Sequence, residues 1–148
     1  MEGVSRAYLA MAQLRDGHLP EAEVEARRAV SLLSRFQPSQ PLALATLACV
    51  LLAQGSVAEA LQEVMRAFSQ IESTDRALEG DSLVRVVYAE ALEANGQHAG
   101  ARAALVAARA RLLALAGRIR DEHWRRSFLD NIPENARTLA LAQRWLGD

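Results

Sequence analysis

The stretch "PLALATLACVLLAQG", residues 41–55, decides the fold of this chain. Between Leu42 and Ala53 only Thr46 carries a polar group, and no charged residue occurs from position 36 to position 58. A transmembrane helix needs about 20 apolar residues, whereas a run of about 12 is more typical of a helix buried in a protein core. Prolines precede the run and Gly55 follows it. The stretch therefore predicts one short helix surrounded by protein, and no membrane span.

The composition predicts a single all-α domain over residues 1–148. Hydrophobic residues make up 51% of the chain, and 29 of its residues are alanine. Alanine and leucine favour helix, because neither loses much side-chain freedom there. The 8 glycines and 4 prolines fall in short clusters that separate long helical segments. These clusters predict helices at about 4–16, 19–36, 41–53, 57–72, 79–95, 98–119, 121–130 and 134–146.

The segments repeat around three glycines, Gly17, Gly55 and Gly96, which lie 38 and 41 residues apart. A repeat of this length with two helices per unit is typical of a helical solenoid built from antiparallel helix pairs. Alanine occurs seven residues before, five after and twelve after each glycine. These positions are Ala10, Ala22 and Ala29, then Ala48, Ala60 and Ala67, then Ala89, Ala101 and Ala108.

Local signals agree with helix pairs joined by tight turns. Each of the three glycines follows a helical segment, where a left-handed C′ residue favours glycine. Ser56 followed by Glu59 has the spacing of a capping box, and Pro20 suits the first turn of a helix. The small alanines would let the two helices of a pair approach closely.

This pattern resembles the tetratricopeptide repeat, over three units at about 4–36, 41–73 and 79–119. The resemblance implies a right-handed α-solenoid, completed here by a C-terminal helical cap from the segments 121–130 and 134–146. The match is degenerate, because Gln13, Leu51 and Leu92 stand where the repeat often has tyrosine. The segment "RRSFLDNIPENARTLALAQRWLG" further resembles the C-terminal ends of large bacterial Ser/Thr kinase or regulatory ATPase proteins. That resemblance implies a fragment of a cytoplasmic signalling protein.

The first helix of each tetratricopeptide unit lines a concave groove that binds peptides or helices. The matching positions follow the spacing i, i+3, i+7, i+10, which puts each set on one helical face. Two sets are apolar and the third ends in acidic residues. None supplies the Lys and Asn with which the family grips a terminal carboxylate. The predicted groove residues are Val4, Ala7, Met11, Leu14, Leu42, Ala45, Cys49, Leu52, Leu83, Val86, Glu90 and Glu93.

An apolar groove needs an occupant, because contiguous apolar patches rarely face water. One candidate is the chain's own last helix, which carries Leu139, Leu141 and Trp145. This helix would either lie in the groove or cap the end of the solenoid. A partner's amphipathic helix or a second copy of the chain is another. The sequence thus leaves two functions open. One is a protein–protein interaction scaffold that docks a helix or peptide, and the other is a structural element whose apolar faces serve dimerisation or internal packing.

Arginines cluster between positions 102 and 126, although the net charge of −1 gives no overall attraction to nucleic acid. On one continuous helix, Arg102, Arg109 and Arg120 share a face. A second set of arginines lies on the nearly opposite face, and Asp121 and Glu122 interrupt the cluster. No aromatic residue is interleaved before Trp124. These features favour a solvated helix over a nucleic-acid site. The second set is Arg111, Arg118 and Arg125.

The sequence predicts neither catalysis, nor a cofactor, nor a metal site. His18, His98 and His123 lie in or near turns, and none has a histidine at the i, i+4 spacing of a helical metal site. Cys49 lies within the most apolar run, where a thiol is usually a buried hydrophobic group with a raised pKa. A single cysteine and an N-terminus without a signal peptide predict a cytoplasmic protein.

Overall fold

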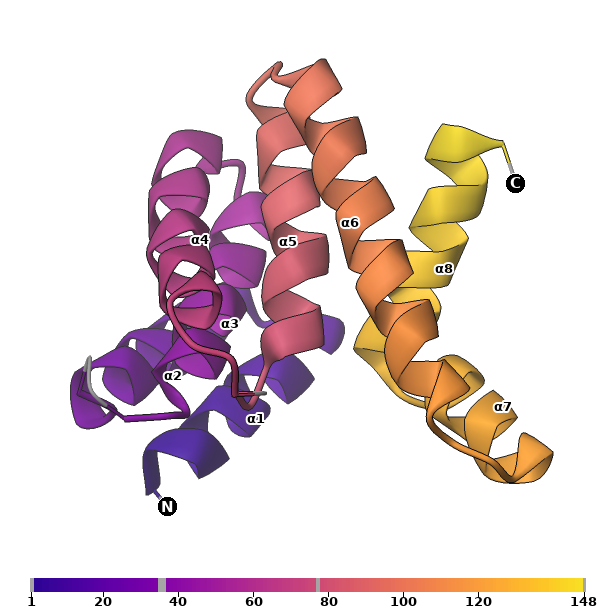
Figure 1. Cartoon of the computed structure of the whole chain (residues 1–148). Helices are drawn as coiled ribbons and strands as arrows, with labels where there is room; N and C mark the ends of the chain where they lie inside the picture. Colours follow the sequence, from indigo (N-terminus) through magenta and orange to yellow (C-terminus); the bar gives the residue numbers. More distant parts are fainter. Residues whose placement is uncertain (1, 35–36, 77, 148) are drawn as a thin grey trace.

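The computed structural model describes residues 2–34, 37–76 and 78–147, and all regular elements in these ranges are α-helices (Figure 1). The prediction of an all-α fold is therefore confirmed. The chain order is α1 (Glu2–Arg15), α2 (Leu19–Leu32), α3 (Gln40–Ala53), α4 (Val57–Glu72), α5 (Asp81–Ala94), α6 (His98–Gly117), α7 (Glu122–Asp130) and α8 (Pro133–Leu146).

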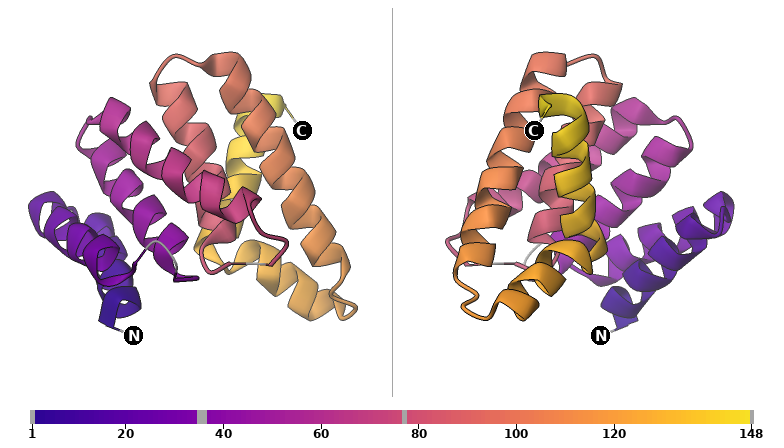
Figure 2. Two further views of the ribbon diagram at one scale, coloured as in Figure 1. Left: turned by 60° about the vertical axis from the view of Figure 1, so that its left-hand side comes forward. Right: turned by 90° about the vertical axis from the view of Figure 1, so that its right-hand side faces the viewer.

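The helices pack mainly as consecutive pairs, α1 with α2, α3 with α4 and α5 with α6 (Figure 2). Each pair contacts the next through α2–α3 and α4–α5, and the first helices α1, α3 and α5 also contact one another in order. The last helix, α8, contacts α5 and α6, just as α5 contacts α3 and α4. The short helix α7 links α6 to α8 and projects away from the pairs in Figure 1. Helix α8 therefore takes the position that the first helix of a further pair would occupy.

The three turn glycines have the predicted conformation. The φ angles of Gly17, Gly55 and Gly96 are 80°, 84° and 80°. After α1, His18 N–H donates to the Gln13 carbonyl at 2.8 Å and Gly17 N–H donates to the Leu14 carbonyl at 3.1 Å. The turns after α3 and α5 have the same two hydrogen bonds. This is the Schellman pattern, which requires a left-handed residue that only glycine adopts cheaply.

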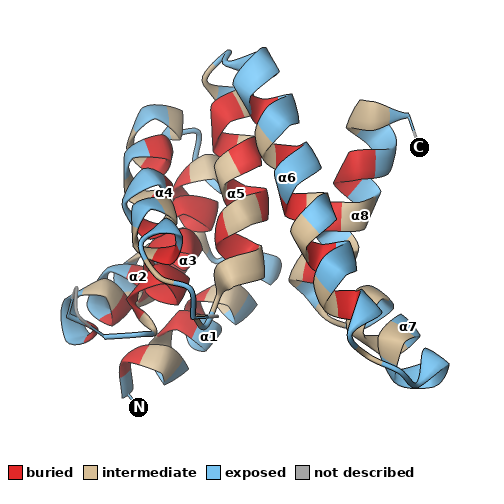
Figure 3. Ribbon diagram, in the orientation of Figure 1, coloured by how far each residue is buried: buried red, intermediate tan, exposed pale blue. Residues whose placement is uncertain are grey.

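The nine alanines at fixed spacings from these glycines lie in the helix-packed interior. All nine are buried, with exposed fractions between 0% and 4%. Helix α3 lies between its neighbours, and the residues from Gln40 to Leu51 are buried on every side of it (Figure 3). The surroundings of the apolar stretch 41–55 are therefore largely the chain's own helices α1, α2, α4 and α5.

Some predicted boundaries and caps differ in the structure. Helix α2 ends at Leu32, because Leu33 is extended with ψ 103°; the rest of the predicted helix includes positions 35–36, which lie outside the described residues. Helix α6 ends at Gly117 instead of near 119. The predicted capping box is wrong, since the Ser56 side chain makes no cap hydrogen bond. Glu59 instead accepts a hydrogen bond from Arg27 of α2 at 2.9 Å.

Helix α5 begins at Asp81 and not at 79, because Gly80 before it has a left-handed φ of 88°. A Cβ built on Gly80 would lie 2.8 Å from the Cα of Leu42 at the start of α3. Glycine is thus required here twice, for its backbone conformation and for the close approach of two helix starts. The repeat pattern around Gly17, Gly55 and Gly96 does not include this position.

Candidate functional site

The predicted groove residues lie along the contacts between α1, α3 and α5. These helices pack against one another. On each helix, some side chains of the predicted face therefore lie in helix–helix contacts and the others lie at the surface. The part of this face that reaches the surface is therefore narrower than the sequence pattern predicts. Six positions belong to the core: Ala7, Leu42, Ala45, Cys49, Leu83 and Val86. Six are half-buried: Val4, Met11, Leu14, Leu52, Glu90 and Glu93.

At the acidic end of this face, Glu90 forms an ion pair with an arginine of the last helix. Arg137 of α8 donates from Nε and Nη2 to Glu90 Oε2 at 3.1 and 2.9 Å, and Nη2 also lies 2.7 Å from Oε1. The Arg137 side chain is 40% exposed and that of Glu90 is 20% exposed. Burial raises the pKa of Glu90, and the nearby guanidinium opposes part of this rise. The chain's own C-terminal helix therefore supplies the cation for Glu90.

The same arginine lies close to Cys49, whose thiol is buried in α3. Burial raises the pKa of Cys49 to about 11, while the positive charge of Arg137 lowers it in part. A thiol with such a pKa is almost wholly protonated at neutral pH and is a poor nucleophile. The expectation that Cys49 is a buried hydrophobic group agrees with this environment.

We expect Cys49 to react slowly with thiol reagents in the folded chain. At pH 8 a rise in pKa from 9.0 to about 11 lowers the thiolate fraction about 100-fold, and burial restricts access further. Alkylation with iodoacetamide, followed by mass spectrometry, should be at least about 100-fold slower than in the same chain unfolded in urea. Equal rates in the two states would contradict the buried position of Cys49.

The same shift predicts how stability depends on pH. The folded chain holds the thiol at a higher pKa than the unfolded chain, so folding favours the protonated form. This contribution is complete below pH 9 and is lost as the pH rises through about 11. Urea unfolding of the wild type and of Cys49→Ala between pH 8 and pH 11 should show the alkaline loss mainly in the wild type.

The predicted basic face is not continuous. Because α6 ends at Gly117, Arg120 lies in the turn after the helix, and its placement on one face with Arg102 and Arg109 is wrong. The second predicted set, Arg111, Arg118 and Arg125, is also divided between different elements. Arg118 is the C-cap of α6, and Arg125 lies in α7 and donates to the Ile119 carbonyl at 2.9 and 2.7 Å. The arginines between positions 102 and 126 are thus divided between α6, the segment after it and α7.

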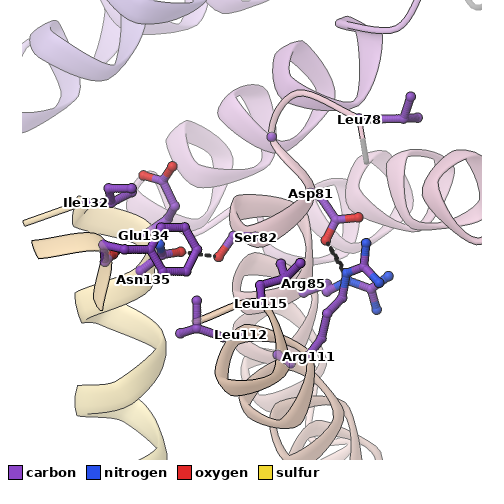
Figure 4. Close-up of a pocket in the computed structure, with 13 residues that line it drawn as sticks. Leu78, Asp81, Ser82, Arg85, Arg111, Leu112, Leu115, Ile132, Glu134 and Asn135 are labelled. Atoms are coloured by element: carbon purple, nitrogen blue, oxygen red, sulfur yellow. Dashed lines mark hydrogen bonds and ion pairs between the residues drawn. The ribbon is translucent and has the colours of Figure 1, made fainter. Parts of the chain in front are cut away.

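A pocket that the sequence analysis did not predict lies between α5, the C-terminal half of α6 and the α7–α8 junction (Figure 4). Its volume is about 210 Å³. Asp81 Oδ1 accepts from Arg85 Nε at 2.8 Å and from Arg111 Nε at 3.0 Å at one end. Three segments separated in sequence form this pocket, so no local pattern signals it. Its apolar lining residues are Leu78, Ala108, Leu112, Leu115, Phe128 and Ile132.

Comparison with models of known protein families and with curated proteins gives no match for this sequence. In the described part of the chain, no three His, Cys, Asp or Glu residues come together in a way that could hold a metal ion. Within the same ranges, none of the helices combines the length and apolarity that crossing a membrane requires.

Proposed function

We propose that this chain is a non-catalytic protein–protein interaction scaffold, built as a right-handed solenoid of tetratricopeptide-like helix pairs. Three turns with one hydrogen-bond pattern and nine buried alanines in register support the repeat assignment. The C-terminal segment, which resembles the ends of bacterial signalling proteins, supports a role inside such a protein in the cytoplasm. We propose no catalytic residue, cofactor or metal for this role.

The partner surface that we propose is the part of the concave face that the core leaves accessible. On α1, Val4, Tyr8 and Met11 have the spacing i, i+4, i+7 and so share one helical face. Tyr8 is 56% exposed, and its hydroxyl donates to Glu79 at 3.0 Å. Half-buried Leu52 on α3 adds apolar surface. This exposed tyrosine beside half-buried apolar residues carries the proposal, because aromatic anchors dominate many protein interfaces.

The ligand class that this surface fits is an amphipathic helix or a peptide with an apolar face. Anchors at i, i+3, i+4 and i+7 on such a helix would lie against the apolar side chains of α1 and α3. Glu79 and Glu93, near the two ends of α5, would favour a partner with basic residues beside its apolar stripe.

A specific observation also favours the alternative, a structural element for internal packing and self-association. Leu141 and Ala142 of α8 belong to the buried core, and Arg137 pairs with Glu90. The C-terminal helix is thus part of the packed structure. On α6, Val106 and Leu113 are exposed seven residues apart and offer apolar surface to a second copy of the chain.

The double substitution Met11→Glu with Leu52→Glu tests the interaction scaffold. Two carboxylates on the proposed surface should weaken binding of an amphipathic helical peptide at least about tenfold, because charged groups lose hydration in an apolar contact. Fluorescence titration with labelled peptides of varied charge, including the sequence 133–146 of this chain, measures this. Met65→Glu is the matched control, because Met65 is 51% exposed on α4 and lies outside the proposed surface.

Circular dichroism checks that the variants stay folded, and sedimentation velocity separates the two functions. A sedimentation coefficient that rises with concentration, without saturable peptide binding, would favour self-association. A monomer at all concentrations that binds none of the peptides would contradict the scaffold.

A further inference from the structure

We propose that the pocket between α5, α6 and the α7–α8 junction binds a small organic monocarboxylate with an apolar body. This proposal is separate from the partner surface on α1 and α3, because different residues form the two places. The proposal rests on three features of the pocket, which are its apolar lining, its cationic end and its fixed walls.

The apolar lining suits a ring or a short alkyl chain. Leu112 and Leu115 of α6 and Ile132 of the α7–α8 junction line the space (Figure 4). Phe128 of α7 also lines it. Ligand sites are typically apolar with a few convergent polar groups. A closed apolar cavity of about 150 Å³ is already large enough for benzene. The volume of about 210 Å³ in this pocket therefore admits a body of six to eight heavy atoms.

The cationic end suits one carboxylate. Arg85 and Arg111 both donate from Nε to the same oxygen of Asp81, so two guanidinium groups share one carboxylate. Among the described residues, no hydrogen bond occupies the Nη groups of Arg111, whose side chain is 36% exposed. A guanidinium fork matches the geometry of a carboxylate and can donate two parallel hydrogen bonds.

Negative groups near the pocket restrict the charge of the ligand. Glu72 Oε1 lies 3.8 Å from Arg85 Nη1 but does not line the pocket, and Glu134 lines the end opposite Arg111 (Figure 4). With Asp81 they would repel a second negative charge, so that a dicarboxylate or a phosphate is disfavoured. A monocarboxylate that directs its charge to Arg111 and its apolar body to Leu112 and Leu115 satisfies both constraints.

Hydrogen bonds hold the walls of the pocket in place before a ligand binds. Ser82 Oγ donates to Asn135 Oδ1 at 2.6 Å, and Asn135 Nδ2 donates to the Phe128 carbonyl at 2.9 Å. Asn135 is buried, so these bonds connect the start of α8 to α5 and to α7 in the protein interior. A preformed site loses less conformational entropy when it binds a ligand.

The proposal is tested by titrating the whole chain with hexanoate and with benzoate at constant ionic strength. Methyl NMR signals of Leu112 and Leu115 should shift and saturate. Hexanol, benzyl alcohol and inorganic phosphate at equal concentrations should bind at least about tenfold more weakly, because each lacks either the charge or the apolar body. The titration also includes an N-acetylated tripeptide that ends in leucine. If this peptide binds more tightly than hexanoate and benzoate, the source of the carboxylate is a peptide chain terminus.

Arg111→Met keeps an apolar stem and should weaken carboxylate binding at least about tenfold. Its matched control is Arg102→Met, an exposed arginine of the same helix that does not line the pocket. Leu115→Phe provides an independent variant, which should block binding by filling the pocket while Arg111 stays in place. Thermal unfolding checks that each variant remains folded.

Three results would overturn the proposal. The first is a linear shift of the Leu112 and Leu115 signals without saturation. The second is binding of the alcohols as tight as that of the carboxylates, and the third is a folded Arg111→Met variant that binds like the wild type. Saturable carboxylate binding that both pocket variants lose and Arg102→Met keeps would support it.

Discussion

Gly80→Ala should lower the free energy of unfolding by about 3 kcal/mol, which lowers the melting temperature of a chain of this size by about 6–12 °C. Two effects add at this position. An alanine with a left-handed φ costs about 1–2 kcal/mol, and Gly80 has a φ of 88°. The new Cβ would also lie 2.8 Å from the Cα and 2.9 Å from the Cβ of Leu42, so backbone atoms of α3 must move.

Gly55→Ala separates the two effects. Gly55 has nearly the same φ, 84°, but a Cβ built there meets no atom within 4 Å. It should therefore lose only the conformational part, about 1–2 kcal/mol. Urea unfolding of both variants, followed by circular dichroism, measures the difference. Equal losses at the two glycines would show that the starts of α3 and α5 are not in close contact.

Leu44→Ala should destabilise the chain by about 3 kcal/mol, within the range of 2–5 kcal/mol for a buried leucine. Leu44 is 0% exposed in α3, which α1, α2, α4 and α5 surround. The substitution removes apolar contacts and leaves a cavity that rigid neighbouring helices cannot fill completely.

Leu52→Ala on the same helix is the comparison. Leu52 is half-buried and packs against the core, so its loss should cost about 1 kcal/mol. Chemical denaturation at equal protein concentration measures both values. A cost for Leu52→Ala as large as that for Leu44→Ala would mean that this side of α3 is core, which would contradict the partner surface that we propose.

The sequence was a good guide wherever one local signal had one physical cause. Gly17, Gly55 and Gly96 required a left-handed residue after each helix, and the structure has it at all three. The alanines in register are all buried, because a helix pair with a tight turn needs small residues at the contact. The capping box at Ser56 failed, since that side chain makes no cap hydrogen bond and Glu59 pairs with Arg27 of another helix.

The candidate sites were less predictable, since residues distant in sequence build them. The groove pattern assigned residues to helical faces but could not show which positions are covered, and half of them belong to the core. Arg120 was placed on a helix that ends three residues earlier, at Gly117. The pair Arg137–Glu90 and the pocket at Arg111 join segments about 30 to 50 residues apart, and no local pattern signals them.

The sequence by itself determined that this chain forms helices, where three of its tight turns lie, and which small residues lie between paired helices. These features follow from backbone conformation and from side-chain size, which act over a few neighbouring residues. Only the tertiary structure decided that α8 packs against α5 and α6, that Arg137 neutralises Glu90, and that a pocket opens beside Arg111. Burial and ion pairing depend on which distant segments meet, and that depends on the packing of the whole chain.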